Sequence, residues 1–188
     1  IEELVSQGVQ GLAIAPNNSP EIRQCIDELY EQGIPVITLN SDAPGSRRLA
    51  FIGMDNYRAG QTAAGLLRLT LPEGGKVLPL AGHLNNTAHN NRLNGFMDTI
   101  NSETGNEIEL LAFQPCFDRD DYAHEITQHA LRANPDLTGI YVASNGQVGA
   151  CAAVEEEGRK GKVKVVAFDL NPMNMELLQS DSLSFVLD

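Results

Sequence analysis

Tryptophan is absent from this sequence of 188 residues, and aromatic residues make up only 5% of it. Any ring contact to a ligand must therefore come from a few Phe and Tyr side chains. Basic residues are scarce as well, because 13 Lys and Arg stand against 25 Asp and Glu, which gives a net charge of −12. An acidic surface repels phosphate backbones, so we expect that this stretch of chain does not itself bind nucleic acid.

Long apolar runs are also missing. No segment could cross a membrane and none has the layout of a signal peptide, although the first residues already resemble a helix leading into a strand, so export stays open. Cysteine is rare: Cys25, Cys116 and Cys151 are odd in number and widely spaced beside apolar residues. They are predicted to be buried free thiols, which favours a reducing compartment.

Enzyme motifs are missing too. The sequence has no GxSxG elbow, no HExxH and no P-loop, and "PEGGK" lacks the spacing of a phosphate-binding loop. His124 and His129 lie five positions apart and would point in different directions on a helix, while His83 and His89 are predicted to be solvated loop residues. We therefore expect no enzyme activity, no cofactor and no metal.

Strand-like apolar runs alternate with helix-like segments along the whole chain. Helices are predicted at 19–33, 56–71, 91–102, 121–133, 147–158 and 173–179. Strands are predicted at 11–16, 34–39, 49–53, 76–82, 108–113, 138–144, 162–168 and 183–188. Strands that are apolar on both faces and separated by helices predict an α/β fold, with a doubly wound parallel sheet covered by helices on both sides.

Polar residues follow most of the predicted strands. They are Asn17, Asn18, Asn40, Ser41, Asp42, Asp55, Asn56, Gln114, Ser144, Asn145 and Asp169. Each alone could serve a turn or a helix cap. Ligands of open parallel sheets, however, bind beyond the carboxyl ends of the strands. Amides and carboxylates can bind neighbouring hydroxyls in pairs, so the set favours a neutral sugar or polyol over a nucleotide.

Asp169 is the clearest member of this set, because it follows the buried strand "VVAF". Pro172 suits the first position of the next helix and Asn171 suits its N-cap. Asp169 is therefore not needed as a cap, and we expect that it serves a ligand.

Four motifs resemble the type I periplasmic sugar-binding proteins and the effector domains of LacI-type transcription regulators. They are "FIGMDNYRAGQTAAGLL", "NNRLNGFMDTI", "YVASNGQVGACAAVEEEG" and "VKVVAFDLNP", in family order over nearly the whole chain. The resemblance implies two doubly wound lobes with a sugar in the cleft. It assigns 1–54 to part of an N-terminal lobe, 55–186 to a C-terminal lobe and 187–188 to the start of a crossing segment. Because the first lobe would be incomplete, we expect the sequence to belong to a longer chain.

The resemblance also implies ligand-binding residues. Arg92, Asn145 and Asp169 match family positions that contact the sugar, although Gly146 stands where an Asp usually follows the amide. Asn40 and Asp42 follow a strand whose end carries an acidic contact in relatives, and Asn40 in that place implies a different hydroxyl pattern. Phe117 matches an aromatic that covers a sugar face, with a role in loop packing as the alternative.

Two functions share this resemblance. We expect the effector domain of a LacI-type regulator, which would be cytoplasmic and homodimeric, bind a small sugar or polyol, and reach DNA only through a separate N-terminal module. The three lone cysteines and the segment "GSRRLAFIGMDNYRAGQTAAGLL" favour this interpretation. The alternative is an exported sugar-binding receptor of an ABC transporter, periplasmic or extracellular. Neither function requires membrane insertion.

Overall fold

The computed structural model describes residues 1–83, 86–102 and 107–188. The described chain forms two compact units. Unit 1 holds Ile1–Asp55 with a short piece that ends at Ala88, and unit 2 holds the remaining described residues.

Unit 1 contains a parallel sheet of three strands in the order β1-β2-β3. The strands are β1 (Leu12–Ile14), β2 (Val36–Leu39) and β3 (Ala50–Ile52), and the helices are α1 (Glu2–Ser6) and α2 (Pro20–Glu31). Helix α2 begins where the sequence predicts, because the Ser19 side chain accepts a hydrogen bond of 3.3 Å from the Ile22 N–H and Pro20 opens the first turn. Its buried residues Ile26 and Leu29 pack with Leu12 and Val36 in the core of this unit.

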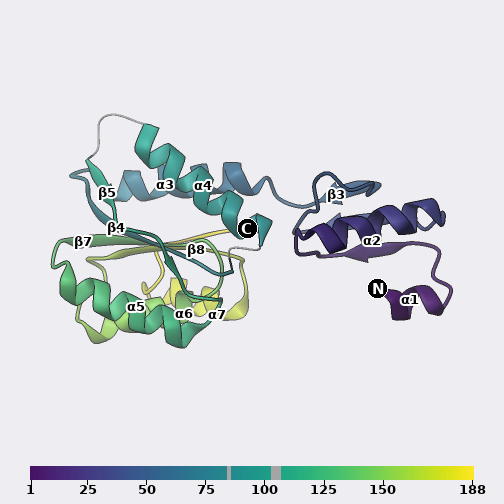
Figure 1. Ribbon diagram of the computed structural model, residues 1–188. Helices are drawn as coiled ribbons and strands as arrows, with labels where there is room; N and C mark the ends of the chain where they lie inside the picture. The colour runs from purple at the N-terminus through teal and green to yellow at the C-terminus, as the bar shows by residue number, and fades with distance from the viewer. Residues whose placement is uncertain (84–85, 103–106) are drawn as a thin grey trace. The chain divides into compact units, whose positions relative to one another are not determined.

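Unit 2 is a parallel sheet in the order β5-β4-β7-β8-β9, and the two-residue strand β6 also pairs with β4. Its strands are β4 (Gly75–Ala81), β5 (Ile108–Leu110), β6 (Gln114–Pro115), β7 (Leu137–Val142), β8 (Lys164–Phe168) and β9 (Phe185–Leu187). Its helices are α3 (Asn56–Thr70), α4 (Thr87–Ser102), α5 (Asp120–Ala133), α6 (Gln147–Glu156) and α7 (Pro172–Gln179), of which α4 belongs to unit 2 from His89 onward. Helices α3 and α4 cover one face of the sheet, and α5, α6 and α7 cover the other (Figure 1).

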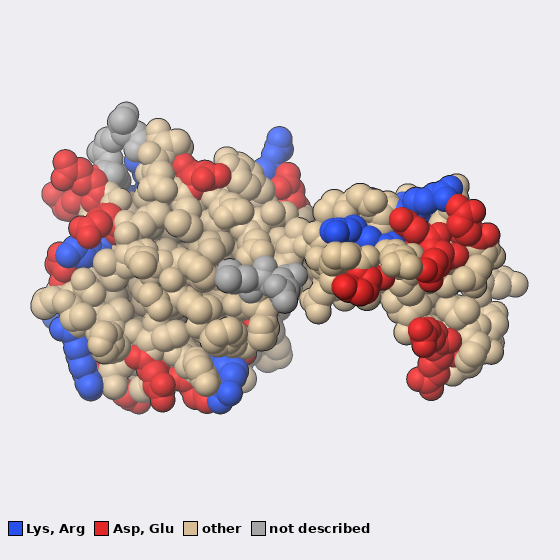
Figure 2. Space-filling view, in the orientation of Figure 1, with Lys and Arg blue, Asp and Glu red and all other residues tan. Residues whose placement is uncertain are grey.

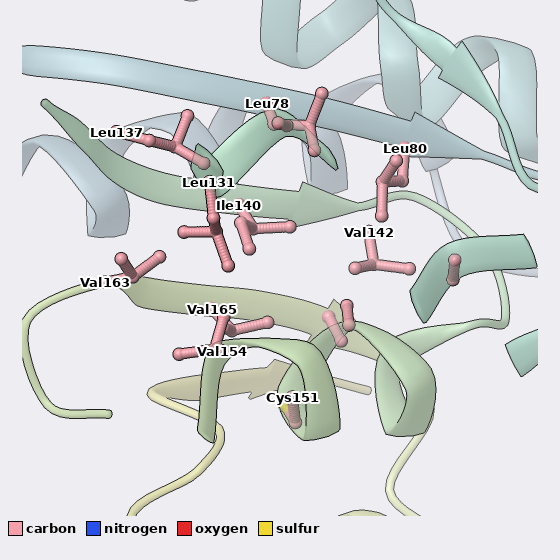
Figure 3. Close-up of a cluster of buried hydrophobic side chains, with 14 of the residues drawn as sticks. Leu78, Leu80, Leu131, Leu137, Ile140, Val142, Cys151, Val154, Val163 and Val165 are labelled. Atoms are coloured by element: carbon pink, nitrogen blue, oxygen red, sulfur yellow. The ribbon is translucent and has the colours of Figure 1, made fainter. Parts of the chain in front are cut away.

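The main core of unit 2 lies between the sheet and the second helical layer. Figure 3 shows side chains of β4, β7 and β8 that point toward side chains of α5 and α6. Among them Leu80, Ile140 and Val165 are fully buried. Since both faces of the sheet are covered, its central strands β4, β7 and β8 bury several successive residues rather than alternate ones.

Helices α3 and α4 approach each other closely at two glycines. A Cβ atom on Gly60 would lie 2.0 Å from the carbonyl oxygen of Arg92, and one on Gly95 would lie 2.0 Å from that of Tyr57. No side chain fits at either position, so the two backbones touch directly. The contact fixes the place of α4 and therefore that of Arg92.

Charged residues are distributed without a basic patch on the face in view. Figure 2 shows the Lys and Arg side chains of both units scattered, several of them beside Asp or Glu. Ion pairs on the surface include Lys76 with Asp136 at 3.1 Å and Arg132 with Glu157 at 2.7 Å. Among the residues that the structure describes, no helix is both long and apolar enough to cross a bilayer.

The predicted α/β class with parallel sheets is confirmed, with three local corrections. Strand β6 was not predicted, because two residues carry no periodic signal. Helix α4 begins earlier than predicted and includes His89, whose side chain is only 15% exposed, so the prediction of a solvated loop histidine is wrong. The three cysteines are free thiols as predicted, but Cys25 is only partly buried.

Candidate ligand-binding site

Arg92 lies in unit 2 on α4 and is held from three sides. Its side chain is 5% exposed, and its Nε donates a hydrogen bond of 2.8 Å to Oδ1 of Asn56, the first residue of α3. The guanidinium carbon lies 4.0 Å from the centroid of the Phe168 ring, at cation–π distance. Nη2 lies 3.5 Å from Oδ1 of Asp169. The guanidinium is thus fixed at the carboxyl end of β8, with donors directed at an acid.

Asp169 follows β8 in a left-handed conformation, with φ of 67°. Short polar residues such as Asp and Asn tolerate this region better than other non-glycine residues. Its backbone N–H donates to the carbonyl of Leu187 at 2.9 Å, which continues the pairing with β9. The side chain is 55% exposed, so one carboxylate faces both Arg92 and solvent.

Asn174 on α7 holds the turn that follows β8 through its side-chain amide. It is fully buried, and its Nδ2 donates hydrogen bonds to the carbonyls of Phe168 at 3.0 Å and Asp169 at 2.8 Å. Its Oδ1 accepts a hydrogen bond of 3.0 Å from Nε2 of Gln147 at the start of α6. The N-cap of α7 is Asn171, as predicted, which leaves the Asp169 side chain outside the cap.

The loops after β6 and β7 meet at Asp118. Its Oδ1 accepts a hydrogen bond of 3.2 Å from the Asn145 backbone N–H. Phe117 and Asp118 are both left-handed, with φ of 56° and 58°. The turn leaves Phe117 44% exposed, with its ring centroid 5.6 Å from that of His83. Phe117 therefore packs against His83, in the segment after β4, and still presents an open ring surface.

His89 lies between these two groups of residues. Its Nδ1 is 3.9 Å from Oδ1 of Asp118, and it stands three positions before Arg92 on α4. Burial lowers the pKa of His89, while the Asp118 carboxylate acts in the opposite direction. The imidazole is therefore neutral at neutral pH.

A hollow of about 470 Å³ opens beside Asn145 in unit 2. It is bordered by the loop after β6 and by the first residues of α6 and α7, among them Asp118, Gln147, Asn171 and Met173. The polar atoms on this border come from carboxylates, amides and backbone. A compact, hydroxyl-bearing molecule suits such a lining.

The two predicted residues of unit 1 have different surroundings. Asn40 follows β2 with φ of 59° and is exposed. Asp42 accepts hydrogen bonds from Thr38 at 2.7 Å, from the Ala43 N–H at 2.8 Å and from Arg48 at 2.7 Å. Burial alone would raise the pKa of Asp42, but these hydrogen bonds outweigh it and lower the pKa. Both carboxylate oxygens of Asp42 are thus engaged within unit 1.

The geometry brings some predicted residues together. Arg92 faces Asp169, and Phe117 adjoins Asp118, which holds Asn145. Within the described residues, no group of three His, Cys, Asp or Glu side chains is placed to hold a metal ion. The fixed donors of Arg92 beside the exposed acceptor Asp169 can bind hydroxyl groups in pairs.

The family description "Periplasmic binding protein domain" matches residues 1–188. The chain belongs to this family. Its two units of parallel sheet and helices have the fold of type I periplasmic binding proteins.

Curated relatives of this periplasmic binding protein domain include sugar-binding proteins. It is 29% identical over 174 residues to the ribose import binding protein RbsB of Escherichia coli K12, covering 92% of this chain and 57% of the relative. It is 28% identical over 193 residues to the D-allose-binding periplasmic protein of the same organism, covering 97% and 61%. The chain therefore spans about three fifths of the length of these relatives.

Solved structures give the same result. GanP, a glucose-galactose binding protein from Geobacillus stearothermophilus, matches with a TM-score of 0.88 and 28% identity, covering 97% of this chain and 65% of that one. An ABC transporter solute binding protein from Burkholderia graminis, in complex with D-arabinose, matches with a TM-score of 0.88 and 29% identity, covering 97% and 64%. All four proteins are named for binding sugars or solutes and none for regulating transcription. They favour the transport alternative over the predicted LacI-type regulator.

Several residues of the site were not predicted. Asn56 was predicted only as one of the strand-end polar residues, His89 was predicted to be a solvated loop residue, and neither Asp118 nor Asn174 was predicted to belong to the site. His89 precedes Arg92 by one helical turn, so an earlier start of the predicted helix would have placed both on one face. Asn174 carried no signal, because an Asn in the first turn of a helix is ordinary.

Proposed function

We propose that the intact protein binds a monosaccharide as the sugar-binding protein of an ABC import system. The observation that carries this proposal is the pairing of buried Arg92 with half-exposed Asp169 at the carboxyl end of β8, 3.5 Å apart. A sugar hydroxyl between them would accept from the guanidinium and donate to the carboxylate. Hydrogen bonds to charged groups contribute about 1.5–3 kcal/mol each, enough to select a hydroxyl-rich ligand.

Asn145 and Phe117 complete the proposed contacts of unit 2. Asn145 would supply an amide to a further hydroxyl, and the open ring of Phe117 would cover an apolar face of the sugar. The acids around the site, Asp118 and Asp169, disfavour a phosphorylated ligand. Names of relatives support ribose, allose and arabinose as first candidates.

For unit 1 we propose Asn40 as the ligand contact and give Asp42 a different role. Asn40 is exposed at the end of β2, where its amide is open to a ligand. Asp42 already accepts hydrogen bonds from three residues, Thr38, Ala43 and Arg48, and we assign it to holding the loop in shape.

The import role replaces the cytoplasmic regulator as the favoured hypothesis, with a periplasmic or extracellular location and a membrane permease as partner. Support comes from relatives that are named as import and periplasmic binding proteins. The homodimer and the separate DNA-binding module belong to the regulator hypothesis and stay predictions without support here. Two buried free thiols are compatible with either location, because burial raises the pKa of Cys116 and raises that of Cys151 to about 12, which leaves both poorly reactive.

A thermal-shift screen of the full-length protein tests the ligand class. D-ribose, D-allose, D-xylose, D-arabinose and D-glucose would be compared with ATP and NAD at equal concentrations. We expect one or more sugars to raise the melting temperature and the nucleotides to leave it unchanged. Stabilisation by nucleotides alone would refute the proposal, and localisation of the protein by cell fractionation would separate import from regulation.

A further inference from the structure

His89 shares one face of α4 with Arg92, because residues three positions apart on a helix are neighbours. Its side chain is 15% exposed, in contrast to a surface histidine. Its Nδ1 lies 3.9 Å from Oδ1 of Asp118, a residue of another loop. His89 thus stands between the Arg92–Asp169 pair and the loop that holds Asn145.

Asp118 has little freedom to move. A Cβ atom on Gly82 would lie 2.2 Å from Oδ1 of Asp118, so the carboxylate rests directly on the backbone after β4. The same oxygen accepts the hydrogen bond from the Asn145 N–H. Any group that attracts this oxygen toward α4 would weaken its bond to Asn145.

Four charged or titratable groups surround His89. Arg92 belongs to its own helix, Asp118 to the loop after β6, Asp169 to the turn after β8 and His83 to the segment after β4. Burial has the largest effect and lowers the pKa of His89. Asp118 and Asp169 raise this pKa and Arg92 and His83 lower it, with a net result below the ordinary value.

We propose that His89 is a positioning residue of the sugar site, whose neutral imidazole keeps Asp118 on the Asn145 backbone and Arg92 directed at Asp169. This inference rests on the proposed sugar binding. A proton on His89 would create an imidazolium that attracts the Asp118 carboxylate and repels the Arg92 guanidinium on the same helix face. Both changes disturb groups that contact the sugar.

The sign of the pH effect follows from this arrangement. The form that binds sugar carries a neutral His89, so bound sugar opposes protonation. Affinity is therefore full at pH values well above the ordinary histidine pKa of about 6.5, and it falls as the pH drops through the lowered pKa of His89. Binding on the acidic side releases protons to the buffer.

Titration calorimetry on the full-length protein tests the proposal. The sugar with the largest thermal shift among D-ribose, D-allose, D-xylose and D-arabinose would be titrated at pH 7.5 and pH 5.5. We expect the native protein to bind this sugar more weakly at pH 5.5 than at pH 7.5, because bound sugar opposes the proton that His89 takes up in the free protein. His89→Asn should show equal affinities at both pH values.

A matched control is His124→Asn. His124 lies on α5, away from the proposed site, and it also pairs with an acid, since its Nε2 is 2.9 Å from Oε2 of Glu156. This variant should therefore keep the pH dependence of the native protein. Titrations at pH 5.5 in two buffers of different ionisation enthalpy add a second readout. Sugar binding should release protons with the native protein but not with His89→Asn. If His89→Asn melts at too low a temperature to be measured, His89→Gln replaces it.

The outcomes separate this inference from the function on which it rests. Failure of every sugar to bind at pH 7.5 refutes the proposed function, and the role of His89 falls with it. Sugar binding with equal affinity at both pH values, or an unchanged pH dependence in His89→Asn, refutes the role of His89 alone.

Discussion

The hydroxyl of Tyr141 donates a hydrogen bond of 3.0 Å to the backbone carbonyl of Arg92. Tyr141 is fully buried on β7, and its ring stacks on Phe96 of α4 with centroids 3.9 Å apart. Burial raises the pKa of Tyr141 further above its ordinary value, so this phenol stays a donor at all physiological pH values. A strand of the sheet thereby holds the helix that carries the proposed sugar-binding arginine.

Tyr141→Phe should remove this hydrogen bond and keep the packing of the ring. We expect the free energy of unfolding to fall by about 1 kcal/mol, the usual net value of one hydrogen bond. Tyr122→Phe is the control, because Tyr122 is 40% exposed on α5 and should lose little. Urea denaturation of both variants measures the difference, and equal stabilities would contradict the role of the phenol.

Asp169→Asn should lower sugar affinity with little effect on folding. The change replaces half of the acceptor capacity with donors, so we expect at least a tenfold loss, about 1.4 kcal/mol. Asn also tolerates the left-handed backbone at this position, which has φ of 67°. Calorimetry beside thermal melting checks both parts. Unchanged affinity together with a large drop in melting temperature would mean that the acid is structural.

Asn174→Ala should destabilise the protein strongly. The change leaves the buried carbonyl of Phe168 and the partly buried carbonyl of Asp169 without their amide donor, and a buried unsatisfied group costs about 1–3 kcal/mol. Asn134→Ala is the matched control, because its amide donates only to the carbonyl of Ala130 at a partly exposed helix end. Denaturant titration should give a much lower free energy of unfolding for Asn174→Ala than for Asn134→Ala. The reverse order would exclude a role in holding the turn.

Gly60→Ala and Gly65→Ala should change stability in opposite directions, although both lie on α3. The Cβ on residue 60 would meet the Arg92 carbonyl at 2.0 Å, whereas nothing lies within 4 Å at position 65. Overpacking typically costs about 1–3 kcal/mol, while Gly→Ala in an open helical position gains up to about 1 kcal/mol. Thermal melting shows whether each change raises or lowers stability. Sugar affinity should fall only in Gly60→Ala. Stabilisation by both changes would disprove the close helix contact.

Much of the fold was predictable, because it depends on signals within single segments. The apolar residues among 163–168 indicated a strand covered on both faces, and Asn171 with Pro172 indicated the start of α7. Arg92 and Asp169 were predicted through resemblance to a family, and the structure places them 3.5 Å apart. Their role in binding sugar stays a prediction.

The supporting residues were not predictable, because their roles depend on contacts between distant segments. Asn56 holds Arg92 across 36 positions of sequence, and Asp118 holds Asn145 across 27. Asp42 shows the opposite case: its place after a strand suggested a ligand contact, yet its oxygens are engaged by Thr38, Ala43 and Arg48. A sequence pattern gives the residue type at a strand end but not the partners that occupy it.

The left-handed residues at the strand ends bear on any effort to engineer a sensor from this domain. Asn40 directly follows β2 in unit 1 and Asp169 directly follows β8 in unit 2, and both have positive φ. β-Branched and bulky residues are strained in that region, whereas Asn, Asp and Gly are not. A combinatorial library for a new sugar therefore needs only these three amino acids at positions 40 and 169. The same restriction applies to position 117, where φ is 56°, so wider diversity belongs at Asn145, whose exposed side chain leaves room for it.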